Sequence, residues 1–361
     1  MTAPRIEVDL QKIRYNTQSL VQRLGKRGIS VTGVTKAVCG HPDIARAMLD
    51  GGVAGLADAR IENIERMRGS GIICPTSLIR TPMVSQSDRV IADCGISFNT
   101  ELDTIHRLAT AAQRVNRVHG IVLMVEMGDL REGILPGELK QFVTRAMSIP
   151  GIAVKGIGTS FACLSGNAPD QQAMSAFSKL VTEIEVACAL SLETVSGGNS
   201  ANLPWAFGDA STGRVNDLRL GEAILLGVDP VSSHAIDGLF TDAFVLVAEV
   251  IEAKLKPERN KKSRAEPDPT HFQQSILALG YQDTDIDGLT LPLKHTLIGA
   301  TSDHLMLGTG DSHLAIGAEI ALQPNYSALM RAMNAPNVAK VVRNAKSSDR
   351  DHMTRLRAAP C

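Results

Sequence analysis

The sequence predicts an α/β protein, with an N-terminal (β/α)8 TIM-type barrel over residues 1–232 and a C-terminal mainly-β domain over residues 233–361. Apolar stretches and amphipathic helical patterns alternate through the first 228 residues, whereas from about residue 240 the apolar runs follow one another without helices between them. Parallel strands joined by crossover helices bury both faces of a sheet, and eight such units close a barrel. An open doubly wound sheet is the alternative for the first part.

The opening elements of the predicted barrel have clear boundaries. After Asp9, which suits a helix N-cap, apolar residues recur on one helical face, and Gly25 is a stop signal. Residues 29–35 form a β-branched run that predicts the first barrel strand, and Pro42 lies in the first turn of the next helical pattern. The other seven strands are predicted near 55–58, 72–79, 89–98, 118–126, 152–158, 194–196 and 217–220.

The second part of the chain predicts a β domain. Its strand runs lie near 244–254, 275–280, 295–300, 304–307 and 314–322. Residues 256–270 mix Lys, Arg, Glu and Pro without an apolar face, which is typical of an exposed loop. We expect the chain to close with a helix over 329–342 and a charged tail from Lys346.

Composition and charge exclude several classes of protein. Hydrophobic residues make up 44% of the chain and charged residues 21%, which is typical of a globular protein with a sizeable core. Because 38 acidic residues balance 37 basic ones, we expect no nucleic-acid partner. With no secretory signal pattern, no membrane-length apolar run and six scattered cysteines, we expect a cytoplasmic protein with reduced thiols and no membrane partner.

Lys36 is the first candidate for chemistry, because it stands where the first predicted barrel strand ends. Catalytic residues of barrels collect at the C-terminal ends of the strands. A lysine that has lost its proton is a neutral amine, which can form a Schiff base with an aldehyde cofactor. On position alone, the alternative is a strand-end lysine whose stem packs on apolar surface while its ammonium reaches water.

Motifs spread over nearly the whole chain resemble one known family. IEVDLQKIRYN, VTGVTKAVCG and LADARIENIERMR resemble the opening of the alanine racemase-like, fold type III pyridoxal 5'-phosphate enzymes, with the ornithine racemase-type members most similar. The resemblance continues in order through EMGDLREGI, GIGTSFAC, SGGNSANLP, LRLGEAILLG, TSDHL and NYSALMRAMNAPNVAKVV. It implies a racemase of a free amino acid that uses pyridoxal 5'-phosphate, with ornithine or another diamino acid favoured.

The resemblance also implies a set of cofactor-binding residues. Lys36 would hold the cofactor and exchange the substrate Cα proton on one face. Arg219 matches the arginine that faces the pyridine nitrogen, where a permanent cation keeps that nitrogen unprotonated. Arg131 matches the arginine near the phenolic oxygen and the substrate carboxylate. The phosphate would lie on the loops after strands seven and eight, at Asn199, Ser200, Gly221 and Glu222.

Structural or solvent-facing roles without catalytic meaning stay open for these positions. Arg219 could form a surface salt bridge, Arg131 could cap a helix or face solvent, and SGGNS could be an ordinary glycine-rich turn. Asp129 and Glu132 could attract the second ammonium of a diamino acid, or they could be exposed loop acids.

A two-base racemase needs an acid/base group on each face of the planar carbanion. In the family, the group opposite the lysine is a tyrosine from the partner's β domain, within a Gly-Tyr-x-Asp-Gly motif. LGYQDTDIDG resembles this motif and makes Tyr281 the candidate, although Thr284 replaces the second glycine. His304, with Asp303 beside it, is the competing candidate because imidazole titrates near neutral pH. Structural roles are the alternatives for both, and the shared site implies a homodimer.

Departures from the family pattern favour one branch of it. Ser160 stands where alanine racemases carry a histidine that supports Arg219, and residues 39–41 replace the tyrosine expected after the lysine. These differences argue against alanine racemase proper and agree with the ornithine racemase-like branch.

Two other functions stay open. A metal-assisted aldolase or dehydratase on the same fold would need a divalent ion, for which His304, Asp311 and His313 are candidates. The sequence shows no defined ligand spacing, and we expect no metal. A non-catalytic carrier of the cofactor would share the lysine and the phosphate loops but resembles the barrel alone, so the β domain argues against it.

Overall fold

The computed structural model describes residues 2–257, 271–310 and 314–343. The chain divides into two compact units, which we call the barrel unit, residues 13–241, and the β unit, residues 1–12 with 242–361. The N-terminal residues therefore group with the β unit, whereas the expected boundary after residue 232 placed them in the barrel. The reason is the strand β1 (Arg5–Asp9), which pairs antiparallel with β10 (Phe244–Pro257).

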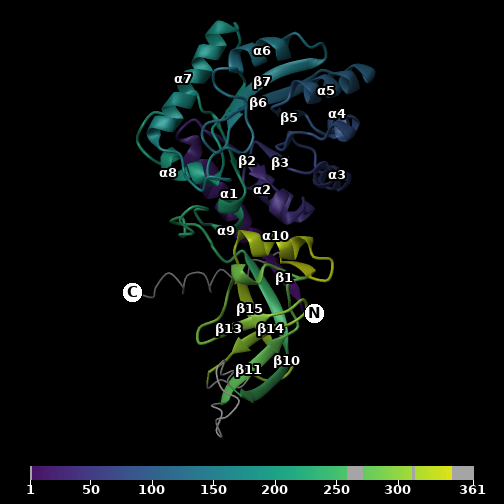
Figure 1. The fold of residues 1–361 in the computed structure, drawn as a ribbon, viewed down its shortest axis with the longest axis vertical. Coiled ribbons are helices and arrows are strands. Elements are labelled where there is room, and N and C mark those ends of the chain that lie inside the picture. The colour runs from purple at the N-terminus through teal and green to yellow at the C-terminus, as the bar shows by residue number, and fades with distance from the viewer. Residues whose placement is uncertain (1, 258–270, 311–313, 344–361) are drawn as a thin grey trace, which may run out of the picture. The chain divides into compact units, whose positions relative to one another are not determined.

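The barrel unit contains a closed ring of eight parallel strands, which confirms the predicted fold class (Figure 1). The ring closes where the first and last strands pair, with Thr32 opposite Arg219. The strands are β2 (Ser30–Val34), β3 (Gly55–Asp58), β4 (Thr76–Leu78), β5 (Ile96–Asn99), β6 (His119–Val125), β7 (Ile152–Thr159), β8 (Thr194–Ser196) and β9 (Asp217–Leu220).

Helices alternate with these strands along the chain. Asp9 caps the first of them as predicted, since its Oδ1 accepts hydrogen bonds from the backbone N–H groups of Gln11 (2.9 Å) and Lys12 (3.1 Å). The helices are α1 (Leu10–Gly25), α2 (Pro42–Asp50), α3 (Ile61–Gly69), α4 (Ser87–Asp93), α5 (Leu102–Arg114), α6 (Leu139–Met147), α7 (Gln171–Ala187), α8 (Leu203–Ala206) and α9 (Glu222–Leu226).

Two predicted barrel strands were too long. The stretch 72–79 forms a strand only in β4, and the stretch 89–98 begins in helix α4 and reaches β5 only at Ile96. In α4 the buried residues Val90 and Ile91 face the interior from a helix. A short apolar run of this kind does not distinguish a helix from a strand.

The described strands of the β unit form one sheet. Its main path runs β12-β15-β10-β11-β14-β13, and β1 joins β10 to β16. The predicted strand runs of this domain are confirmed in outline. Besides β1 and β10, the strands are β11 (His271–Leu277), β12 (Leu289–Thr290), β13 (Thr296–Ala300), β14 (Leu305–Gly308), β15 (Glu319–Pro324) and β16 (Ala339–Arg343).

The predicted closing helix over 329–342 was wrong in its second half. Helix α10 (Tyr326–Asn334) ends before Pro336, and β16 then runs parallel to β1, with Arg5 opposite Ala339. Ala335, which precedes the proline, is extended, as the proline ring requires. The predicted loop 256–270 lies outside the described residues apart from its first two positions, which belong to β10, and the tail from Lys346 lies outside them entirely.

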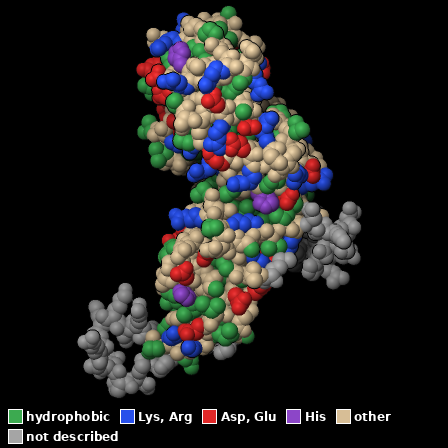
Figure 2. Space-filling model, turned by 90° about the vertical axis from the view of Figure 1, so that its right-hand side faces the viewer, with side chains coloured by type: hydrophobic (Ala, Val, Ile, Leu, Met, Phe, Trp, Pro, Cys, Tyr) green, Lys and Arg blue, Asp and Glu red, His purple; other side chains and the backbone are tan. Residues whose placement is uncertain are grey.

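Charge is mixed over the surface. Figure 2 shows acidic and basic side chains close together over the face of the barrel unit that it displays. Among the described residues, none of the helices has the length and apolar character needed to cross a membrane.

Gly156 marks a tight approach between two barrel strands. It pairs with Thr194 in the register of β7 and β8, and a Cβ at this position would lie 2.2 Å from the Thr194 carbonyl oxygen. We expect Gly156→Ala to lower the free energy of unfolding by about 1–3 kcal/mol, because the strands must move apart. Gly25→Ala is the matched control, since Gly25 ends α1 in open space. Urea denaturation checks both, and equal midpoints for the two variants would contradict the expectation.

Candidate active site

Lys36 follows β2 directly and opens the short 3-10 helix η1 (Lys36–Val38). Its side chain is exposed, and the turn beneath it is fixed by hydrogen bonds. Thr35 donates its hydroxyl to Asp58 Oδ2 at 2.7 Å, and Asp58 Oδ1 accepts from the Arg60 N–H and from Asn63 Nδ2, both at 2.9 Å. The lysine is therefore presented on a rigid turn at the C-terminal end of the barrel strands, as predicted from its position.

Arg219 is buried in β9, with 6% of its surface exposed. Its Nη1 donates to Ser196 Oγ at 2.5 Å, and its Nη2 donates to the Thr159 carbonyl at 2.8 Å and to Ser160 Oγ at 2.9 Å. The guanidinium carbon also lies 5.1 Å from the centre of the Phe98 ring. This environment rules out the surface salt bridge that the sequence left open. Among the described residues, none accepts a hydrogen bond from Arg219 Nε.

A carboxylate that the sequence analysis missed stands two residues before this arginine. Asp217 is 8% exposed and accepts hydrogen bonds from the hydroxyls of Thr32, at 2.7 Å, and Ser196. Burial raises the pKa of Asp217, and the two hydroxyls and the Arg219 charge oppose that rise. The available signal was the spacing in DLRL, because residues two apart on a strand face the same side.

The four residues predicted for a phosphate lie on two loops joined by a hydrogen bond. Asn199 caps the 3-10 helix η3 (Ser200–Asn202), and its side chain accepts from the Ala201 N–H at 2.8 Å. Ser200 Oγ accepts from the Ala223 N–H at 3.2 Å, in α9, which Gly221 and Glu222 begin. The structure thus brings Asn199, Ser200, Gly221 and Glu222 into one neighbourhood after β8 and β9.

Gly198 shows why this loop needs glycine. Its φ is +140°, and a Cβ here would lie 2.1 Å from Asn202 Oδ1. That oxygen accepts the Asn199 N–H at 3.0 Å, so a larger residue would break the capping arrangement of η3. SGGNS is therefore a built turn in which the second glycine has a steric role.

Glu222 places a carboxyl group on a loop that the sequence predicts to bind phosphate. Burial raises its pKa to about 7, the Lys36 charge opposes this rise, and the Asp229 charge adds to it. Lys36 and Glu222 thus influence one another electrostatically across the ends of β2 and β9. Near neutral pH the Glu222 carboxyl is partly protonated, which reduces its repulsion of a bound anion.

The raised pKa of Glu222 makes folding stability depend on pH. The folded protein holds this proton up to about pH 7, whereas the unfolded chain releases it near 4.5. Through this group the free energy of unfolding falls as the pH rises from 4.5 to 7, by about 3 kcal/mol at most. We therefore expect Glu222→Gln to be more stable than the parent at pH 8 but not at pH 4.5.

Urea denaturation of the cofactor-free protein at the two pH values measures this effect. Glu138→Gln, which removes an exposed carboxylate from the same unit, is the control. A stability difference between Glu222→Gln and the parent that is the same at both pH values would contradict the expectation.

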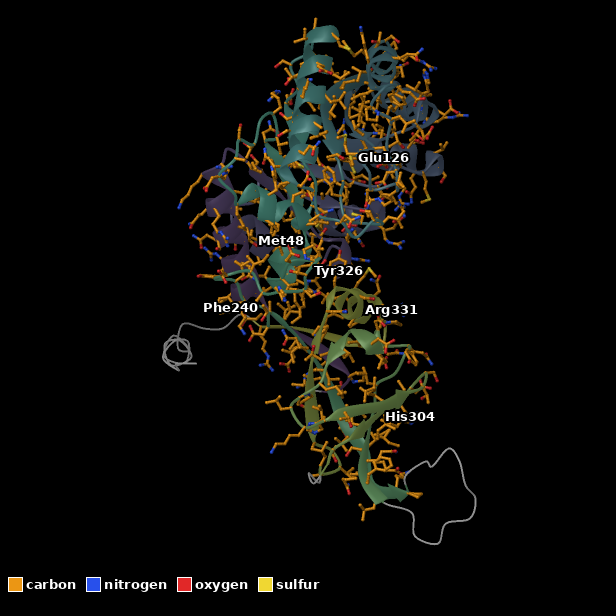
Figure 3. The ribbon with its side chains drawn as sticks, turned by 60° about the vertical axis from the view of Figure 1, so that its left-hand side comes forward. Met48, Glu126, Phe240, His304, Tyr326 and Arg331 are labelled. Atoms are coloured by element: carbon orange, nitrogen blue, oxygen red, sulfur yellow. The ribbon has the colours of Figure 1, made fainter. Side chains whose placement is uncertain are left out.

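The loop after β6 carries Arg131. Glu126, labelled in Figure 3, holds this loop, because its Oε1 accepts the N–H groups of Gly128 at 2.6 Å and Leu130 at 3.0 Å. Arg131 forms an ion pair with Glu132, and its Nη2 reaches Ser160 Oγ at 3.4 Å. Ser160 thus accepts hydrogen bonds from both candidate arginines, which places Arg131 and Arg219 in one cluster.

Asp129 is buried, in contrast to the exposed loop acid that the sequence left open. It is 4% exposed, and its Oδ1 accepts from the Leu164 N–H and from both the N–H and the hydroxyl of Ser165, at 3.0 to 3.2 Å. Its Oδ2 is enclosed and has no hydrogen-bond partner among the described residues. Burial raises the pKa of Asp129, but the hydrogen bonds outweigh it and the pKa is lowered overall, so this carboxylate is an anion.

The two candidates for the second base lie together on the β unit. The Tyr281 N–H donates to the Thr301 carbonyl at 3.0 Å, and the Thr301 N–H donates to the His304 carbonyl at 2.8 Å. Tyr281 is half-exposed, so it is not a buried structural tyrosine. His304, labelled in Figure 3, is also exposed.

Two details of this region differ from expectation. The Asp303 carboxylate accepts hydrogen bonds from Gln282 Nε2 at 3.1 Å and Ser302 Oγ at 2.8 Å, and none joins it to His304 among the described residues. Thr284, at the position of the motif's second glycine, is buried and donates its hydroxyl to the Ala328 carbonyl at 3.0 Å. Its φ is not positive, so this turn does not require glycine there.

The metal-site alternative finds no support in the described residues. Among them, no group of three or more His, Cys, Asp or Glu side chains could hold a metal ion. Asp311 and His313 lie outside the described residues, so the structure places only His304 of that proposed set.

The fold and the site define a class: a TIM-type barrel with a lysine after its first strand, a buried arginine in its last and paired loops that suit an anion. The chain belongs to the family described as alanine racemase, N-terminal domain, whose model matches residues 8–230. It is 31% identical to the ornithine racemase of Acetoanaerobium sticklandii, over 93% of this chain and 99% of that protein. It is also 31% identical to the lysine racemase of Thermotoga maritima, over 94% and 99%.

A solved structure shares the whole fold. The alanine racemase of Streptomyces lavendulae superposes with a TM-score of 0.75 at 18% identity, over 97% of this chain and 100% of that one. This likeness concerns the fold, and it covers both the barrel unit and the β unit.

Proposed function

We propose that the protein is a pyridoxal 5'-phosphate-dependent racemase that interconverts the L and D forms of a free diamino acid of the ornithine and lysine class. The observation that carries this proposal is an exposed lysine at the end of the first strand in a barrel whose last strand holds a buried arginine with a free Nε donor. The full-length likeness to an ornithine racemase and a lysine racemase supports the activity and the substrate class.

The residues present fit the cofactor. Lys36 would hold its aldehyde carbon, and Arg219 Nε, a donor without a protein acceptor, suits the ring nitrogen. The Ser200 hydroxyl and the loop backbone at Asn199, Gly221 and Glu222 would hold the phosphate. Arg131 would face the phenolic oxygen and the substrate carboxylate. When bound, the cofactor supplies an electron sink that stabilises negative charge at the substrate Cα.

The residues of the chain then have separate tasks. The Lys36 amine takes or returns the Cα proton on one face of the substrate. The permanent cation of Arg219 would keep the ring nitrogen of the cofactor unprotonated, which would weaken it as an electron sink and favour proton exchange over side reactions. Tyr281 or His304 of a partner subunit would serve the opposite face, so we propose a homodimer with shared active sites.

The β unit offers apolar surface that a dimer would cover. Leu293 is 93% exposed, and Leu297, Ile298 and Ile316 are also exposed. Burial of exposed apolar side chains in a dimer interface would remove them from water. We also propose a cytoplasmic location, which agrees with the free state of the five described cysteines.

One preparation of purified protein tests this function. The enzyme with bound cofactor is incubated with L-ornithine, L-lysine, L-alanine and L-serine in deuterated water, and Cα deuterium and chirality are followed. The proposal expects exchange and D-product from a diamino acid, with little from the other two. Bound cofactor without exchange would favour the carrier alternative, and activity lost to a chelator would favour the metal-assisted one.

The same assay identifies the second base. If Tyr281 serves the opposite face, Tyr281→Phe should stop racemisation, yet one enantiomer should still exchange its Cα proton with retention, through Lys36. His304→Ala is the matched variant for the competing candidate. Racemisation that survives both substitutions would exclude both residues.

A further inference from the structure

We propose that Asp217 is a positioning residue for Arg219, acting through the hydroxyl of Ser196, and that it thereby sets how Arg219 Nε meets the cofactor ring nitrogen. This inference rests on the proposed function, because it concerns the ring of the proposed cofactor.

Arg219, Ser196 and Asp217 are linked by two consecutive hydrogen bonds, each with a defined donor and acceptor. Arg219 Nη1 donates to Ser196 Oγ at 2.5 Å, and Ser196 Oγ donates in turn to Asp217 Oδ2. The direction is fixed by chemistry, because a guanidinium can only donate and the serine has one proton to give. Asp217 Oδ1 is held from the other side by the Thr32 hydroxyl at 2.7 Å.

Hydrogen bonds within the protein use three of the five N–H donors of Arg219 and leave Nε–H and the second Nη1 hydrogen without an acceptor among the described residues. Both Nη2 hydrogens are used by the Thr159 carbonyl and by Ser160 Oγ, and Nη1 is held by Ser196. The guanidinium is thus fixed at three points, one at the end of β8 and two at the end of β7. Its plane, and therefore the direction of the free Nε–H, depends on the position of the Ser196 hydroxyl.

Charge gives the carboxylate a second effect on Arg219. Burial lowers the pKa of Arg219 and raises that of Asp217, and each charge opposes the shift of the other. Ser196 is fully buried, so little water screens the two charges across its hydroxyl. The Asp217 charge therefore favours the charged guanidinium and attracts it toward the Ser196 hydroxyl that lies between them.

Ser196→Ala breaks this chain and leaves both charges in place. We expect kcat to fall about 10- to 100-fold and the cofactor dissociation constant to rise by a similar factor. The KM for the amino acid should stay within about threefold, because Ser196 is fully buried and is not expected to contact the substrate. A misplaced Nε–H should also allow ring protonation, so that more substrate transfers its amino group to the cofactor and leaves as the 2-oxo acid.

Ser97→Ala is the matched control. Ser97 is an equally buried serine of the same barrel, and its hydroxyl contacts His119 Nε2 at 2.8 Å instead of Arg219. It should lose stability like Ser196→Ala without the change in cofactor affinity or in 2-oxo acid released per turnover. Asp217→Asn is the second variant, and its effects should match those of Ser196→Ala in kind.

The double variant decides whether the two residues act in one chain. Ser196→Ala with Asp217→Asn should lose no more cofactor affinity than the worse single variant, whereas independent residues would give the product of the two losses. Multiplying losses, or a Ser196→Ala variant that behaves like Ser97→Ala while the parent racemises, would overturn this inference alone. A parent protein that binds no pyridoxal 5'-phosphate would overturn the proposed function and this inference with it.

Discussion

Replacing Lys36 by alanine is expected to abolish racemisation, with kcat/KM lowered by at least about a thousandfold. The lysine is both the anchor of the proposed cofactor and the base on one face of the substrate, so both contributions disappear together. Its side chain is exposed and makes no hydrogen bond or ion pair with the described residues. The free energy of unfolding should therefore change by less than about 0.5 kcal/mol.

Cα deuterium exchange measures the activity of the Lys36 variant, and urea denaturation measures its stability. Lys26→Ala, an exposed lysine of the same unit, should leave both quantities near those of the parent. A Lys36→Ala enzyme that keeps a tenth of the parental activity would exclude Lys36 as the base, whatever its spectrum shows.

The Arg219→Ala variant is expected to lose about 3–5 kcal/mol of unfolding free energy, besides its affinity for the cofactor. The reason is the buried Asp217 carboxylate, which would remain in the barrel without its counter-charge. Ser196 and Ser160 would also lose the donor that they share. Denaturation of the cofactor-free protein separates this structural loss from the catalytic one.

Two further variants serve as comparisons for the stability of Arg219→Ala. Arg114→Ala removes an arginine from a surface pair with Asp88, whose side chains are 60% and 72% exposed, and should cost less than about 1 kcal/mol. Arg219→Lys keeps the charge but lacks the planar fork, so its stability should lie between the parent and Arg219→Ala. An Arg219→Ala loss as small as that of Arg114→Ala would show that the buried charges are not coupled.

Local patterns were enough to predict the barrel. Each strand and its following helix have their own period and turn residues, so all eight parallel strands could be found one by one. β1 and β16 could not be predicted in this way. Each pairs with a strand more than 200 residues away in sequence, and no local pattern reveals such a partner. The apolar spacing near Leu329 therefore predicted a helix that ran past Pro336.

The location of two candidate residues was predictable from sequence, whereas their roles came from the resemblance to a family. Lys36 and Arg219 stand at strand ends, and the structure places them as expected. Asp217 and Ser196 were missed. The Ser196 hydroxyl connects the Asp217 and Arg219 charges only when β8 and β9 lie side by side, and the sequence does not show that alignment. The sequence could not decide whether Asp129 was an exposed loop acid, since burial of a loop depends on the loop that covers it. Tyr281 and His304 stay predictions, because each would act from a partner's β unit.

The pairing of β1 also determines the order in which the protein can be completed during synthesis. β1 ends at Asp9, but its first partner, β10, begins at Phe244, 235 residues later. At about 5–20 residues per second, a ribosome needs roughly 12–47 s to make that intervening chain. All eight barrel strands are synthesised within this interval. The barrel can therefore close before β10, the partner of β1, has been translated.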